Sequence, residues 1–166
     1  MAVVGEFVGS ENTRLTVELD VTTTHTKEWW TTQAKGQNIF VKRKAGDTQP
    51  ANVLLPPVVV PVVNEDNKAM GRLENAFEQG GKMYGAVETI GLAGHVAGSA
   101  SGALAAADFD SWLVGGANGK LRVKTTNERN SGHADYIPRG IAICRGGDKA
   151  GLWASWDTRF SNPTDG

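Results

Sequence analysis

The sequence has a single cysteine among its 166 residues, Cys144. One thiol cannot form an internal disulfide and cannot build a cysteine-based metal site. It ends the apolar stretch GIAIC, where a small buried hydrophobic side chain is the ordinary interpretation. A chain of this length can bury roughly 70% of the surface that its unfolded form exposes. We therefore expect one domain that is stabilised by its core and folds in a reducing compartment.

An excess of charge of either sign is also missing. Seventeen Lys and Arg residues face eighteen Asp and Glu residues, for a formal net charge of −1. Nucleic acids and anionic membrane surfaces attract clustered basic residues, which this sequence does not contain. The segment after Met1 lacks the basic start of a secretory signal, and Glu6 interrupts its apolar part. Partners of the nucleic-acid or membrane class are therefore not expected.

Long hydrophobic runs are scarce. Residues 89–107 carry no formal charge, but only Ile90, Leu92, Val96 and Leu104 are large aliphatic residues. Glycine, serine and alanine contribute little to transfer into a bilayer, so membrane insertion of this stretch would be weakly driven. We expect it to belong to a folded domain.

Catalytic and metal-binding signatures are absent. GSASG at 98–102 has Ala100 where a hydrolase elbow needs serine, and GGANGK lacks the spacing of a phosphate-binding loop. The acidic pairs at 65–66 and 108/110 are expected to be solvated. The histidines are far apart and match no zinc motif: His25, His95 and His133. The sequence predicts no enzyme, no cofactor and no metal site.

Glycine, by contrast, is abundant, with 21 residues, and few segments hold a helical period. This composition predicts a mainly β chain of short strands and turns. Apolar and polar side chains alternate most clearly across RLTVELDV at 14–21. Glycine-rich turns at 115–119 and 145–149 predict two hairpins near the C-terminus. Further strands are expected at 3–8, 39–44, 58–63, 112–114, 121–125, 139–144 and 152–157.

One segment favours a helix. In NKAMGRLENAFEQ, residues 67–79, Met70, Leu73 and Phe77 recur at a helical spacing between a capping Asp66 and a closing Gly80. A strand, a turn and a second strand remain the alternative for this region. A shorter helical piece is expected at 103–109, where GALAAADF is rich in alanine.

Residues 54–63 read LLPPVVVPVV, apolar throughout but with prolines at 56, 57 and 61. Proline has no N–H for a ladder and fixes φ, so we expect an extended edge strand or a polyproline-like arm that lies against another chain. The expected contacts are Leu54, Leu55, Pro56, Pro57, Val58, Val60 and Val62.

Five tryptophans are the second unusual feature. Trp29 and Trp30 lie among polar residues and would point to opposite faces of an extended chain, which predicts a contact surface or, alternatively, a local hydrophobic cluster. Trp153 and Trp156 also lie on opposite faces of a strand, so one is expected in the core and the other against a neighbour. We take Trp29, Trp30 and Trp156 as candidate interface residues.

The C-terminal half resembles the capsid cement proteins of tailed phages, the family of small head-decoration proteins. The likeness is carried by a strand at 110–114, a turn, a strand at 119–125 that begins with Gly-Lys, a polar loop, a strand at 137–144, a glycine-rich turn and a closing strand at 151–157. GGKMYGAVETIGLAG, residues 80–94, is similar to the sequence segment of such proteins that leads into a strand facing the barrel interior. The double tryptophan of the first fifty residues has no counterpart in the shortest members.

The resemblance implies a β-barrel-like decoration domain at 54–166, preceded by an N-terminal strand or arm region at 1–53. It also implies a non-enzymatic, trimeric protein on the outer capsid surface of the virion that ties major capsid protein subunits together. Two other functions stay open: another virion part, such as a tail-tube or head-completion subunit, and a carbohydrate-binding adhesion module that uses exposed tryptophans.

Overall fold

The computed structural model describes residues 13–36, 39–47 and 56–159, and it confirms a mainly β chain with short helices. Five strands form a closed barrel in the order β1-β3-β2-β4-β5. All pairs in the barrel are antiparallel except β1 with β3. The strands are β1 (Arg14–Leu19), β2 (Phe40–Arg43), β3 (Val58–Pro61), β4 (Gly71–Gln79) and β5 (Lys82–Glu88).

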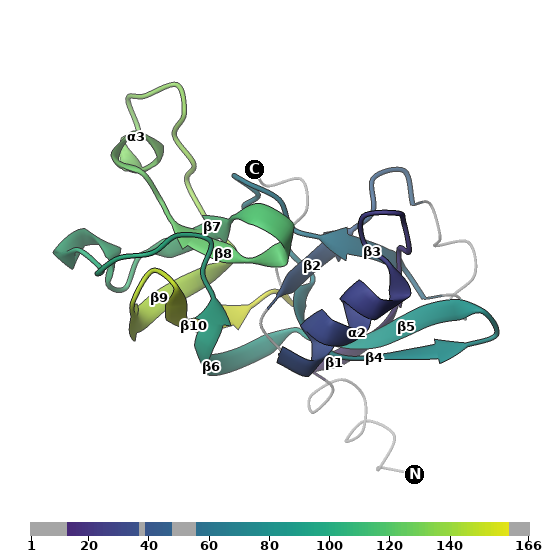
Figure 1. Cartoon of the computed structure of the whole chain (residues 1–166). Coiled ribbons are helices and arrows are strands. Elements are labelled where there is room, and N and C mark those ends of the chain that lie inside the picture. The colour runs from purple at the N-terminus through teal and green to yellow at the C-terminus, as the bar shows by residue number, and fades with distance from the viewer. Residues whose placement is uncertain (1–12, 37–38, 48–55, 160–166) are drawn as a thin grey trace, which may run out of the picture.

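A second sheet of five strands lies beside the barrel (Figure 1), in the order β6-β10-β9-β7-β8. An isolated bridge from Gly98, just after β6, to Leu121 in β8 brings its first and last strands together. Both predicted C-terminal hairpins are confirmed, β7 with β8 and β9 with β10. The strands are β6 (Ile90–Ala97), β7 (Trp112–Gly115), β8 (Leu121–Val123), β9 (Ala142–Gly147) and β10 (Gly151–Asp157).

The predicted helix at 67–79 is wrong, because residues 71–79 form β4. Leu73 is buried in the barrel, whereas Phe77 is 44% exposed, so their spacing does not mark one helical face. Gly71 starts the strand at φ 153°, and a Cβ there would lie 2.2 Å from the carbonyl oxygen of Glu88. The close approach of β4 to β5 at this point therefore requires glycine.

The sequence does contain a helix that its pattern did not predict, α2 (Lys27–Gly36). The hydroxyl of Thr26 accepts a hydrogen bond from the backbone N–H of Trp29 at 3.1 Å, which caps the first turn. Trp30 and Ala34, one turn apart, are buried in the barrel core, and Trp29 packs at its margin. The extended conformation expected for the double tryptophan is therefore wrong, whereas the alternative of a local hydrophobic cluster is confirmed.

The remaining helical pieces are short. The piece expected at 103–109 is reduced to a 3-10 turn, η1 (Ala106–Asp108), and a second turn, η2 (Ala117–Gly119), joins β7 to β8. A single helical turn, α3 (Thr126–Arg129), stands in the loop between β8 and β9. The strand expected at 3–8 lies outside the described residues.

The proline-rich segment is neither an arm nor an edge strand. β3 lies between β1 and β2, with the backbone N–H groups of Glu18 and Asp20 donating to its carbonyls on one side and that of Lys44 on the other. Val62 N–H donates to Phe40, so the even-numbered N–H groups of this segment face β2. The nitrogen of Pro61 faces the opposite side, beyond the last residue of β1. Pro61 thus occupies a position where the ladder needs no donor, and Pro56 and Pro57 precede the first residue of β3.

Two core clusters meet at Trp156 of β10. One fills the barrel, and the other lies beneath the second sheet but includes Phe40 from β2. The rings of Phe40 and Trp156 meet edge to face at a centroid distance of 5.1 Å, and the Trp156 indole N–H donates to the carbonyl of Glu88 at 3.0 Å. The barrel combines strands from both sides of the expected boundary at residue 53/54, so that boundary does not separate an arm from a barrel.

Candidate docking surfaces

Three of the ten predicted interface residues are part of the chain's own interior. Trp30, Val62 and Trp156 are at most 4% exposed, so they cannot meet a partner. Five more are only half-buried, because they flank or form β3 or border the barrel core: Trp29, Pro56, Pro57, Val58 and Val60. Leu54 and Leu55 lie outside the described residues. The prediction of this set as a contact surface is therefore wrong for its buried members.

The tryptophan pair in β10 does divide between two faces, as its spacing predicted, but the exposed member is the other one. Leu152, Ala154 and Trp156 point into the core, whereas Trp153 is 45% exposed. Selecting Trp156 as the interface residue was wrong because the sequence does not reveal which face of β10 has a core beneath it.

The outer face of the second sheet carries a row of side chains that crosses four strands. Strand register places Leu92 of β6 beside Ser155 of β10, Ser155 beside Ile143 of β9, and Ile143 beside Trp112 of β7. Leu92 is 67% exposed and Trp112 is 37% exposed. We call these four residues the outer row.

The surroundings of the outer row suit a contact surface. A hollow of about 400 Å³ lies along it, lined by Ile90, Trp112, Ile143, Ser155 and neighbouring residues. Arg145 borders the row, donating to the hydroxyl of Ser155 at 3.0 Å and pairing with Asp110 at 2.7 Å. A largely apolar strip that contains a tryptophan and has a charged margin resembles the anatomy of protein interfaces. Alternation predicted these strands, but only the strand order reveals that the four residues are neighbours.

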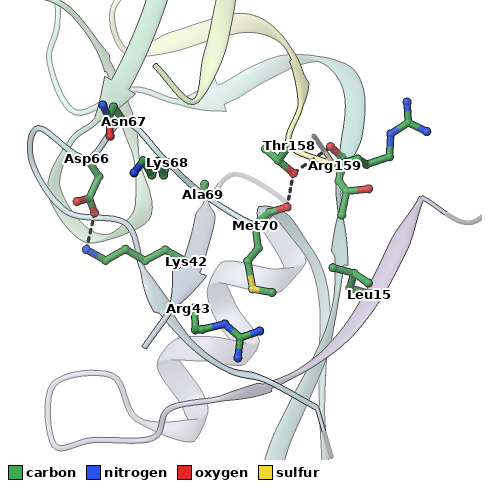
Figure 2. Close-up of a pocket in the computed structure, with 11 residues that line it drawn as sticks. Leu15, Lys42, Arg43, Asp66, Asn67, Lys68, Ala69, Met70, Thr158 and Arg159 are labelled. Atoms are coloured by element: carbon green, nitrogen blue, oxygen red, sulfur yellow. Dashed lines mark hydrogen bonds and ion pairs between the residues drawn. The ribbon is translucent and has the colours of Figure 1, made fainter. Parts of the chain in front are cut away.

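A second concave feature is a pocket of about 670 Å³ at the seam between the barrel and the second sheet (Figure 2). Leu15, Ala69 and Met70 provide its apolar lining. Across the seam, the hydroxyl of Thr158 donates to the carbonyl of Met70, and its backbone N–H donates to that of Thr89 at 2.8 Å. The charged side chains around it are Lys42, Arg43, Asp66, Lys68 and Arg159.

A braced loop between β8 and β9 projects from the second sheet, with α3 near its start (Figure 1). Arg122 holds the Glu128 carboxylate through both terminal nitrogens, at 2.7 and 2.9 Å, and this pairing lowers the pKa of Glu128 to about 2. The Lys124 ammonium donates to the carbonyl of Ile137, and burial lowers the pKa of Lys124. These buried ionic contacts fix the loop, and no catalytic partner is needed to explain them.

Three further observations concern metal binding, the free thiol and membrane helices. No group of three histidine, cysteine, aspartate or glutamate residues could hold a metal ion within residues 13–36, 39–47 and 56–159. Burial raises the pKa of the Cys144 thiol, which makes it a poor nucleophile. Nor does any helix in the described part of the chain have the length and apolarity to cross a membrane.

Comparison with known proteins identifies no relative of this chain. No protein-family model, curated protein or solved structure matches the chain. Any functional interpretation therefore depends on the surfaces described above and on the strand pattern of the C-terminal half.

Proposed function

We propose that the chain is a structural virion protein that binds the outer surface of an icosahedral phage capsid and stabilises the lattice of the major capsid protein. The observation that carries the proposal is the outer row, in which Leu92, Ile143 and the aromatic Trp112 from three strands lie with Ser155 of a fourth on one face of the sheet. Monomeric proteins seldom expose a contiguous apolar patch without a binding role. In this proposal the outer row docks onto capsid subunits.

The strand arrangement also favours the proposal. Four of the segments that resemble the capsid cement family correspond to β7, β8, β9 and β10, which all belong to the second sheet. The remaining segment, residues 80–94, covers β5 of the barrel and the start of β6. Most of the resemblance therefore falls on the sheet that presents the outer row. Association of the chain into a trimer belongs to the same proposal, and sedimentation of the pure protein measures it.

The proposal is tested by co-sedimentation of the chain with expanded shells of the virus that encodes it. Replacing Leu92 and Trp112 together by serine should weaken shell binding by about 30-fold or more, because loss of one buried aromatic anchor at an interface centre, here Trp112, costs about 2 kcal/mol and loss of the Leu92 side chain adds to it. Both side chains are exposed, so folding should be retained, and circular dichroism checks this.

Phe77→Ser provides the matched control. Phe77 is 44% exposed on β4 of the barrel and packs against Tyr84, away from the outer row. This variant should bind shells as the unmodified chain does. Wild-type chain that stays in the supernatant at all concentrations would contradict the proposal.

A carbohydrate-binding module is the second candidate, because Trp112 and Trp153 both expose indole rings from strands of the second sheet. Indole faces can stack on sugar rings. Titration of oligosaccharides against tryptophan fluorescence separates the two candidates: a saturable change that Trp153→Ala removes favours sugar binding, and a flat response removes this candidate.

A further inference from the structure

The pocket at the seam between the barrel and the second sheet has an apolar floor and a cationic rim. Leu15 is 44% exposed and contributes to the floor with Ala69 and Met70. The lining includes four cationic side chains, Lys42, Arg43, Lys68 and Arg159, against one carboxylate, Asp66. The aliphatic stems of lysine and arginine add apolar area below their charged ends.

The cationic side chains of the pocket can bind another anion in addition to the carboxylates with which they already pair. Lys42 pairs with Asp66 at 2.7 Å within the pocket, whereas Arg43 and Arg159 pair with Asp47 and Asp157 from outside its lining. The side chains of Lys42, Arg43 and Arg159 are each 30% to 48% exposed. Asp47, the partner of Arg43, is only 4% exposed, whereas the pairs of Lys42 and Arg159 are partly exposed on both sides. Partly exposed ion pairs are weak and a guanidinium has five N–H donors, so a further carboxylate can be accommodated.

From this geometry we propose that the pocket binds an extended acidic segment of a partner polypeptide, with an apolar side chain on the floor and carboxylates at the rim. In an extended chain successive side chains point to opposite faces, so an acidic-apolar alternation presents both kinds of group at once. The pocket volume of about 670 Å³ lies within the range of about 300–1,000 Å³ that is typical of ligand-binding pockets. The inference builds on the proposed function, since it identifies a second contact with the partner, distinct from the outer row.

Binding of two fluorescein-labelled peptide amides to the full chain tests the inference. The acidic peptide is Gly-Asp-Leu-Asp-Leu-Gly and its neutral counterpart has asparagine at both aspartate positions. The acidic peptide should bind at least about 10-fold more tightly, and its affinity should fall as salt is raised, because charge-assisted hydrogen bonds to its carboxylates are involved. Equal affinity for the two peptides, or no binding of either, would overturn the inference.

Substitutions locate the binding. Lys68→Glu should weaken binding of the acidic peptide about 10-fold, whereas Lys82→Glu, the same charge change on the 62%-exposed Lys82 side chain at the start of β5, should not. Leu15→Ser should weaken it as well, with Phe77→Ser as a control of equal exposure. Should Lys68→Glu fail to fold, Leu15→Ser decides. An unchanged affinity in the folded variants would overturn the assignment, as would full displacement by succinate, which would indicate a small-anion site.

Failure here is distinguishable from failure of the proposed function. If the wild-type chain binds shells but the pocket variants bind both shells and peptide normally, only the pocket assignment is lost. If the wild-type chain does not bind shells, the capsid proposal is lost while the peptide titration still reports on the pocket.

Discussion

Each of the two most buried indole rings reaches a backbone carbonyl with its N–H group. Trp30 donates to the carbonyl of Asp20 and Trp156 to that of Glu88, both at 3.0 Å. A buried indole N–H without a partner would cost about 1–3 kcal/mol, so these contacts allow both rings to be buried whole. The abundance of tryptophan was visible in the sequence. The carbonyl groups that accept these hydrogen bonds belong to residues 10 and 68 positions away from the two tryptophans. The sequence therefore did not reveal which indole rings could be buried.

Glu128 provides a pH-dependent test at the same scale. Its pKa is lowered from 4.5 to about 2, mainly by the two hydrogen bonds from Arg122, with further bonds from Thr125. Because the folded chain holds the ionised form more strongly, this contribution to stability is complete above about pH 4.5 and is lost as the pH falls towards 2. Glu128→Gln should therefore lower the free energy of unfolding by about 2 kcal/mol at pH 7.

The measurement is denaturant unfolding of both proteins at pH 7 and at pH 2.5, where the difference should shrink to a small fraction of its neutral value. Glu78→Gln is the control, since the pair of Glu78 with Lys27 is about half exposed on both sides and should matter little at either pH. A Glu128→Gln effect that is equal at both pH values would show that the ionised carboxylate does not brace the loop.

Among the elements, strands with strict alternation were predicted well and those with mixed signals were not. β1 forms within the predicted segment 14–21 and buries Val17 and Leu19, but Leu15 and Val21, expected on the same face, are exposed. The two glycine-rich hairpins lie where their turns indicated. β4 contains apolar residues that fit a helical and a strand period equally, and only its pairing with β5 decides between them. α2 was missed because its polar exposed residues hide a two-residue buried face, Trp30 and Ala34.

The failure at β3 has a specific physical reason. Proline is excluded from an inner strand only where a neighbouring strand needs a hydrogen bond from its N–H. In this segment the even-numbered N–H groups face β2 and the odd-numbered ones face the side of β1. The N–H of Val60 faces Lys42 of β2 in a hydrogen-bonded pair, whereas residue 61 faces past the end of β1. The sequence reveals the prolines but not the length of the neighbouring strand.

These two positions therefore make a matched test at the scale of the element. Val60→Pro should cost about 3 kcal/mol or more of stability, because it removes a ladder bond and forces the ring against β2. Pro61→Ala should cost about 1 kcal/mol or less, through loss of backbone restriction and some buried surface. Thermal or urea unfolding of both variants checks the order, and equal losses would contradict the proposed orientation of β3.

At the scale of the whole molecule, the two sheets share a seam. Phe40 from the barrel contacts Trp156 of the second sheet, and the Arg72 guanidinium carbon lies 5.1 Å from the centroid of the same ring. Composition and turn chemistry predicted a mainly β molecule, and the resemblance to capsid cement proteins implied a barrel. They could not predict the second sheet's strand order, and therefore neither the outer row nor the seam pocket, because both depend on residues brought together from distant parts of the chain.

The central claim is that the outer row of the second sheet is buried against capsid subunits. Electron cryo-microscopy of the chain mixed with expanded phage shells tests this part of the proposed function most directly. Leu92 and Trp112 should lie in the contact with the shell, while Phe77 on the barrel stays exposed. Density that places the barrel face on the shell and leaves the outer row facing solvent would contradict the account.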